Sequence, residues 1–220
     1  MGHLDREDGV ELAEPRLCRV DVAAGRLTGG DGHYIKTFGD LAGLYGDGAA
    51  FEALRAERGD EAAYEVTTFT PGARVSDLIT GVTRMAPGKV GAEYFLTRGH
   101  IHANADRPEI YYGQAGQGVM QLESPEGEVR LVEIGPQSIC YVPPFWIHRS
   151  INVGAGDLVM MFAYPADSGQ DYGIIARAGG LRVRIVDDGA GGWRQVDNPD
   201  WRQRGPDEIA ALYRGAGAAA

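Results

Sequence analysis

The stretch Thr97-Arg98-Gly99-His100-Ile101-His102 holds two of the five histidines in a chain of 220 residues. A carboxylate, Glu109, follows seven residues after His102, and a further histidine, His148, comes much later. Side chains in a strand alternate between its faces, so His100 and His102 point the same way. Two imidazoles, a carboxylate and a third imidazole can enclose a metal ion, so the stretch predicts metal chemistry on a β-rich fold.

The segments that carry the other two residues suit the same site. On the strand predicted next, Glu109 and Tyr111 share one face, and we interpret that strand as the neighbour of the segment with His100. His148 follows Pro143-Pro144. Two consecutive prolines end a strand and fix a rigid turn, which can present a single histidine.

The types of ligand narrow the choice of metal ion. Three imidazoles and one carboxylate suit Fe, Mn, Ni, Cu or Zn. A four-thiolate structural zinc site is excluded because the chain has two cysteines. Protein ligands that leave room for water or substrate make a catalytic site. The remaining histidines, His3 and His33, lie outside the predicted strands, and we interpret them as surface residues.

The sequence around this stretch predicts an all-β fold. From Tyr64 onward, short runs rich in β-branched and aromatic residues alternate with Gly and Pro turns. Many short strands with regular turns indicate a sandwich or barrel. The predicted strands are 64–69, 76–84, 92–96, 108–113, 119–122, 129–134, 138–142, 150–153, 158–164 and 182–186.

The two ends of the chain differ from this pattern. Residues 1–35 mix acidic residues with Gly and Ala and predict an arm or irregular lead-in. Residues 49–58 predict a helix with Gly59 as its left-handed C-terminal cap, and 206–214 predict a terminal helix. We therefore divide the chain into an N-terminal arm (1–40), a barrel (41–186) and a C-terminal tail with a short helix (187–220).

Composition limits the partners. A formal net charge of −10 argues against non-specific binding to nucleic acid or to an anionic membrane, yet a local pocket can still bind an anionic small molecule. No apolar run approaches the roughly 20 residues that a membrane helix needs.

Cys18 and Cys140 are too few for a disulfide scaffold, and the N-terminus lacks an apolar signal core, so we expect a cytoplasmic protein. Cys140 lies in an apolar strand and is interpreted as a small buried residue.

The order of His-x-His, a glutamate after a short loop and a distant further histidine resembles the cupin superfamily. Its fold is a double-stranded β-helix, or jelly roll, with the metal inside the barrel. Cupins include oxygenases, isomerases, decarboxylases and storage proteins, so the fold alone does not assign a reaction.

Further segments narrow the resemblance. Residues 97–102 together with Glu109-Ile110-Tyr111 look like the signature of the cupin-type glucose-6-phosphate isomerases of archaea and some bacteria. Residues 81–95, 141–149 and 164–173 are similar as well, so the resemblance runs from about Asp40 to Gly173.

This resemblance implies roles for single residues. One divalent ion per subunit, of Fe, Mn, Ni or Zn, would be bound by His100, His102, Glu109 and His148. The phosphate of a sugar phosphate would contact Thr83, Thr97 and Gly99. Hydroxyls and a backbone N–H can hold a phosphate without a cluster of cations.

The same resemblance implies a sugar pocket lined by Tyr64, Tyr111, Tyr164 and Tyr172, with Glu109 and Tyr164 as the catalytic residues. For Tyr64 and Tyr172, a core aromatic with a satisfied hydroxyl is an equally good interpretation. Lys89 and Arg98 could add positive charge near the phosphate or could be solvated surface residues.

Gln170 departs from the family pattern, in which a histidine commonly precedes Asp-Tyr-Gly. Glutamine cannot replace the acid–base chemistry of a histidine. The departure leaves the identity of the sugar or the rate open, whereas the metal site does not depend on it.

The implied reaction interconverts glucose 6-phosphate and fructose 6-phosphate, moving hydrogen between C1 and C2. Proton transfer with Glu109 as base and a metal-assisted hydride shift are both open. The alternatives are an isomerase or epimerase of another sugar phosphate, a metal-dependent cupin dioxygenase, and a non-catalytic cupin. The resemblance, and the sheet edges that a jelly roll must cover, indicate a homodimer.

Overall fold

A six-stranded antiparallel sheet forms one wall of the barrel in the computed structural model, which describes residues 13–75 and 77–214. Its order is β11-β8-β13-β5-β4-β3. The bounds are β3 (Gly32–Thr37), β4 (Ala62–Phe69), β5 (Leu78–Met85), β8 (Glu109–Ala115), β11 (Ile139–Val142) and β13 (Leu158–Pro165). All neighbours pair antiparallel, as expected of a jelly roll.

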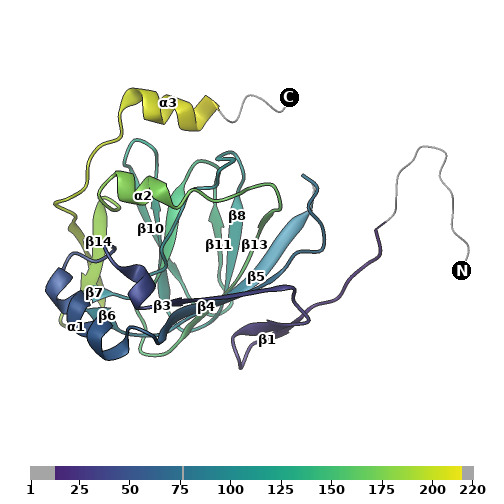
Figure 1. Ribbon diagram of the computed structural model, residues 1–220, viewed down its shortest axis with the longest axis horizontal. Helices are drawn as coiled ribbons and strands as arrows, with labels where there is room; N and C mark the ends of the chain where they lie inside the picture. Colours follow the sequence, from purple (N-terminus) through teal and green to yellow (C-terminus); the bar gives the residue numbers. More distant parts are fainter. Residues whose placement is uncertain (1–12, 76, 215–220) are drawn as a thin grey trace, which may run out of the picture.

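Two smaller sheets complete the barrel region (Figure 1). One has the order β10-β9-β12, with β9 (Gly118–Glu123), β10 (Val129–Ile134) and β12 (Ile147–Asn152). The other has the order β15-β14-β7-β6, with β6 (Lys89–Val90), β7 (Glu93–Tyr94), β14 (Val183–Asp187) and β15 (Trp193–Asp197). A hairpin of β1 (Arg19–Asp21) and β2 (Arg26–Thr28) forms a separate two-stranded sheet, and its strand β2 packs against β4 and β5.

Short helices flank the barrel, as predicted. They are the 3₁₀ turn η1 (Gly39–Leu41), α1 (Gly48–Arg58), α2 (Gly173–Arg177) and α3 (Pro206–Arg214). In Figure 1, α1 lies beside β6 and β7, while α3 lies across one end of the barrel above α2. Helix α1 begins where the Asp47 carboxylate accepts a hydrogen bond from the backbone N–H of Ala50.

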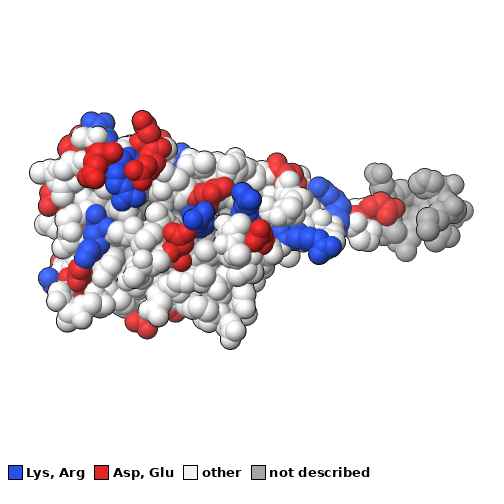
Figure 2. Space-filling view, turned by 90° about the horizontal axis from the view of Figure 1, so that it is seen from below, with Lys and Arg blue, Asp and Glu red and all other residues white. Residues whose placement is uncertain are grey.

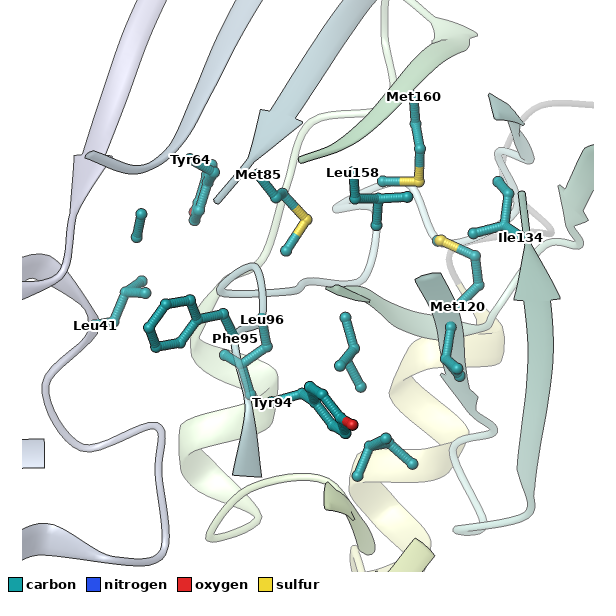
Figure 3. Close-up of a cluster of buried hydrophobic side chains, with 14 of the residues drawn as sticks. Leu41, Tyr64, Met85, Tyr94, Phe95, Leu96, Met120, Ile134, Leu158 and Met160 are labelled. Atoms are coloured by element: carbon teal, nitrogen blue, oxygen red, sulfur yellow. The ribbon is translucent and has the colours of Figure 1, made fainter. Parts of the chain in front are cut away.

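The hydrophobic core lies between the sheets (Figure 3). Met120 from β9 and Met160 from β13 are fully buried, and Leu158 lies beside them. Cys140 belongs to the same core, where burial raises the pKa of its thiol to about 11. The interpretation of Cys140 as a small buried residue is therefore confirmed, because a protonated, buried thiol is a poor nucleophile.

Most predicted barrel strands are observed with bounds shifted by one or two residues, but β12 begins three residues earlier than predicted, and the predicted strand 92–96 is only the two-residue β7. The predictions were wrong at the ends. β10 has the predicted bounds, but residues 19–37 are not an irregular lead-in, because they contain β1, β2 and β3. β3 is an edge strand that pairs with β4; Tyr34, Ile35 and Thr37 favour a strand, but the segment lacks the alternation of apolar and polar residues. β15 lies in the segment that was predicted to be a tail, and it was missed although it pairs with β14.

Two smaller expectations have different outcomes. Gly59 has φ −54° and ψ −33°, so it is not a left-handed cap. Glycine suits the position because a Cβ there would lie 2.4 Å from the carbonyl oxygen of Arg55. His33 is on the surface as expected, with its imidazole 2.8 Å from Glu65, although it lies within a strand. His3 is outside the described residues.

The surface carries charges of both signs side by side. In Figure 2, basic and acidic groups adjoin on the face seen from below, without a large basic patch. None of the described helices is both long and apolar enough to cross a membrane.

Candidate metal centre

Four ligating side chains converge inside the barrel from two different sheets. Glu109 begins β8 of the six-stranded sheet, and His148 lies on β12 of the three-stranded sheet. Glu109 Oε2 is 3.0 Å from Nε2 of His148, 3.2 Å from Nε2 of His102 and 3.9 Å from Nε2 of His100. One ligand atom from each residue lies within 4.8 Å of the others, and all four residues are buried.

The segment with His100 was predicted to be the neighbour of β8, and this prediction is wrong. His100 instead pairs with His148, through N–H···O=C bonds of 3.0 and 2.9 Å in both directions, and Ile101 pairs with Asp171. Gly99 interrupts a regular strand because its φ is +74°. The site therefore spans two sheets, although the expected convergence of His100 and His102 is observed.

Backbone carbonyls set the tautomers of two imidazoles. His102 Nδ1 lies 2.7 Å from the carbonyl oxygen of Arg107, and His148 Nδ1 lies 3.0 Å from that of Trp146. A carbonyl oxygen only accepts, so each Nδ1 donates. Each Nε2 lone pair is then directed to the centre of the site, which is the arrangement of metal-binding histidines.

The centre fits a cation because it contains polar atoms that the described residues do not satisfy. Nε2 of His100 and Nε2 of His102 are buried without a hydrogen-bond partner. Most buried polar atoms in proteins are paired, so two orphans in one cluster need an explanation. The four residues could hold a metal ion that satisfies both nitrogens and the Glu109 carboxylate.

Burial and mutual contacts set the protonation states that a metal requires. Burial, and secondly the nearby His148, lower the pKa of His100 well below its ordinary value. Burial alone would raise the pKa of Glu109, but its contacts with His102 and His148 hold that pKa below the usual range. A neutral His100 and an ionised Glu109 are the forms that bind a cation.

One cavity adjoins the centre and contains every residue that was predicted to contact substrate. Its wall includes His100 and Glu109 together with Tyr64, Thr83, Thr97, Gly99, Tyr111, Tyr164 and Tyr172. Gln170, the departure from the family pattern, lines the same cavity, and its side chain accepts a hydrogen bond from the Tyr172 hydroxyl.

The two cations considered from sequence have different positions. Lys89 forms an ion pair with Asp187 and does not line the cavity. Arg98 is exposed and lies 5.4 Å from the ring centroid of Tyr172, which is part of the wall. Among the described wall residues there is no lysine or arginine.

The tyrosines of the wall are protonated at neutral pH. Burial raises the pKa of Tyr64 and of Tyr164 to about 12. Burial, followed by the charge of Glu109, also raises the pKa of Tyr111. Tyr64 belongs to the hydrophobic core, and its hydroxyl accepts a 3.5 Å bond from the backbone N–H of Arg98, so both interpretations of Tyr64 stay open.

Sequence reasoning missed three polar residues of the wall: Tyr34, Thr68 and Ser150. Strand alternation could have found two of them, because Ser150 stands two residues after His148 and Thr68 four residues after Tyr64. Tyr34 lay in the segment that was interpreted as irregular.

The family profile of glucose-6-phosphate isomerase (GPI) matches residues 35–202. The chain belongs to this family. A glucose-6-phosphate isomerase of Sinorhizobium medicae (strain WSM419) is 63% identical over 203 residues, which are 92% of this chain and 95% of the relative. The glucose-6-phosphate isomerase of Thermococcus gammatolerans is 40% identical over 192 residues, 87% of this chain and 99% of the relative.

The resemblance to cupin-type isomerases is therefore confirmed, and the fold is the all-β cupin jelly roll. A solved oxalate oxidase in complex with glycolate is 16% identical, with a TM-score of 0.42 over 50% of this chain and 55% of its own. That likeness is too distant to bear on function.

Proposed function

We propose that the protein interconverts glucose 6-phosphate and fructose 6-phosphate with one divalent ion, of Fe, Mn, Ni or Zn, bound by His100, His102, Glu109 and His148. One observation carries the proposal: a cluster with two unpaired imidazole nitrogens adjoins a cavity whose wall is rich in hydroxyl groups. The printed names of the relatives support the same activity.

Thr83, Thr97 and Gly99 are the proposed phosphate contacts. The Thr97 hydroxyl oxygen accepts a 3.0 Å bond from the N–H of Ser150, and its hydrogen makes only a long 3.5 Å bond to the Ser150 carbonyl oxygen, which a phosphate oxygen could replace. Glycine is required at position 99 because its φ is +74° and a Cβ there would lie 2.9 Å from the carbonyl oxygen of His148; the proposed phosphate contact is its backbone N–H. Neutral donors of this kind can hold a phosphate, and the exposed Arg98 would add positive charge at Tyr172.

Tyr64, Tyr111, Tyr164 and Tyr172 are the proposed contacts of the sugar. A bound divalent ion would act as a Lewis acid toward the carbonyl of the open-chain sugar. The protonated Tyr164, with its ring centroid 5.6 Å from that of His102, would donate to a sugar oxygen. Glu109 is the proposed base for the proton at C2, although its lowered pKa makes it a weak one.

The fate of the C2 hydrogen tests this role of Glu109. With substrate deuterated at C2, proton transfer predicts that deuterium washes out into solvent during turnover. Full retention of deuterium in the product would instead favour the hydride shift and would leave Glu109 as a ligand only.

A coupled assay tests the activity itself. Fructose 6-phosphate would be supplied, and the formation of glucose 6-phosphate and of mannose 6-phosphate measured with and without a strong chelator. We expect glucose 6-phosphate as the product and loss of activity with the chelator. Activity that resists the chelator would contradict the metal role, and mannose 6-phosphate as the main product would change the substrate.

Gln170 offers a sharper test of substrate choice, because it lies in the cavity wall and accepts a hydrogen bond from Tyr172. We expect Gln170→His to change kcat or the ratio of the two products while the metal content stays constant. An unchanged rate and product ratio would show that position 170 does not act in catalysis.

A homodimer is proposed because the outer face of the six-stranded sheet exposes large apolar side chains. Ile139 on β11 is 69% exposed, and Ile110 on the adjacent β8 is exposed on the same face. Exposed apolar patches of this kind often mark interfaces. Sedimentation of Ile139→Asp against the native chain would detect a loss of dimer. The cytoplasmic location and the domain boundaries 1–40, 41–186 and 187–220 stay predictions.

A further inference from the structure

Tyr34 is a fifth tyrosine of the cavity wall, and it comes from outside the family match. The match begins at residue 35, whereas the other four tyrosines of the wall lie within it. The substrate contacts that the family resemblance implies do not include Tyr34.

The strand register directs Tyr34 into the barrel. Tyr34 on β3 pairs with Val66 on β4, and Val66 pairs with Thr83 on β5. Residues paired directly across a sheet share a face, and all three line the same cavity. Adjacent strands are about 4.8 Å apart, so the Cα atoms of Tyr34 and Thr83 are separated by roughly 10 Å. Tyr34 and Thr83 therefore flank Val66 on the cavity face of the sheet.

Tyr34 is also accessible from outside. It is 43% exposed, because β3 is the edge strand of its sheet. Its hydroxyl has no hydrogen-bond partner within residues 13–75 and 77–214. Burial, and then the neighbouring Tyr172 and Tyr64, raise the pKa of Tyr34, so the hydroxyl is a donor at neutral pH.

The tyrosines next to Tyr34 lead to the segment of the proposed phosphate contacts. Tyr64 accepts the backbone N–H of Arg98, and the Arg98 guanidinium lies over the ring of Tyr172. Arg98 stands between Thr97 and Gly99 in the sequence. Tyr34, Tyr64, Tyr172 and Thr97 line one cavity, whose described wall offers a dianion no lysine or arginine.

We propose that the Tyr34 hydroxyl donates a hydrogen bond to the phosphate group of the substrate, alongside Thr83 and Thr97. The proposal rests on the proposed function only in that the ligand is a sugar phosphate. Because the described wall contains no lysine or arginine, neutral donors would make the direct bonds to the phosphate while Arg98 adds charge at Tyr172, and Tyr34 supplies one such donor from the edge of the sheet.

The test compares Tyr34→Phe with Tyr213→Phe, in the metal-loaded full chain. Tyr213 on α3 has a similar exposure of 40% and lies outside the cavity. Binding of inorganic phosphate and of fructose 6-phosphate would be measured by calorimetry, and KM and kcat by the coupled assay. Metal content and melting temperature would be recorded for both variants.

For Tyr34→Phe we expect both ligands to bind about tenfold more weakly, the loss of one hydrogen bond to a charged group. KM should rise by a similar factor with little change in kcat, because the bond is made equally before and during the reaction. Metal content and melting temperature should be those of the native chain, and Tyr213→Phe should bind both ligands normally.

Three results would overturn the proposal. They are normal phosphate binding by Tyr34→Phe, an equal weakening in Tyr213→Phe, and a native chain that binds neither ligand. A native chain that binds phosphate through Tyr34 but does not isomerise glucose 6-phosphate would overturn the proposed function and leave this inference standing.

Discussion

Glu109 and Glu123 are buried glutamates of the barrel with different surroundings. Their side chains are 2% and 0% exposed. Glu123, at the end of β9, accepts hydrogen bonds from Arg204 Nη1 at 2.8 Å, Trp201 Nε1 at 3.2 Å and the backbone N–H of Arg182 at 2.6 Å. Glu109 faces three imidazoles, and no lysine or arginine of the described chain pairs with it.

The difference distinguishes a structural charge from a functional one. A buried carboxylate is costly unless its charge is compensated. Arg204 compensates Glu123 from within the chain and so fastens the C-terminal segment to the barrel. For Glu109 the described residues supply no lysine or arginine, so its charge is paired with imidazoles alone. The cluster at Glu109 could therefore hold a cation from solution.

The largest effect is expected from Glu109→Gln. An amide is a weaker ligand than a carboxylate, and the loss of Lewis-acid assistance should lower kcat by about 10³-fold or more. Metal per subunit would be measured by mass spectrometry beside the coupled assay. Glu123→Gln is the control and should keep its metal when folded. Full metal content and activity in Glu109→Gln would contradict the functional role that distinguishes Glu109 from Glu123.

Arg204→Met should be the most destabilising of these changes. Removing one partner of a buried ion pair leaves Glu123 uncompensated, at a cost of about 3–5 kcal/mol in the free energy of unfolding. Urea denaturation would measure it. Arg130→Met, which breaks an exposed pair with Glu128, should cost about 1 kcal/mol or less. Similar losses in the two variants would show that burial does not set the strength of the Glu123 pair.

Asp167→Asn should weaken metal binding without destroying the site. The Arg107 guanidinium contacts both oxygens of Asp167, and the Arg107 carbonyl orients His102. Loosening a group that supports a ligand should lower metal affinity by about tenfold. Competition with a chromophoric chelator would measure it. Asp187→Asn, which breaks the surface pair with Lys89, should leave the affinity unchanged.

The smallest effect concerns acidification of the metal-free protein. The pKa of His100 is lowered in the folded state by burial and by His148, so between that pKa and its ordinary value of 6.5 only the unfolded chain binds the proton. Stability is therefore complete above pH 6.5 and falls as the pH drops below it, by about 1 kcal/mol per unit for this proton. Urea titrations from pH 7.5 to 5.5 would show the slope, which His100→Gln should reduce.

The ligand set and most barrel strands could be predicted because their signals are local. Alternation within a strand relates His100 to His102, and the two prolines before His148 mark a turn. The edge strand β3 was not predicted, because its segment lacks the alternation of apolar and polar residues, and only the structure shows its pairing with β4. Because Tyr34 lies on β3, its place in the cavity wall was not predicted either.

The sequence by itself determined the type of ligands, the β-rich barrel and the family, since these depend on residue identity and short-range periodicity. Only the tertiary structure decided that the His100 segment joins His148 and not β8, because chain pairing depends on residues far apart in sequence. It also decided which of two buried glutamates is left without a compensating charge. That outcome depends on where Arg204 packs, roughly eighty residues beyond Glu123, where no local pattern reveals it.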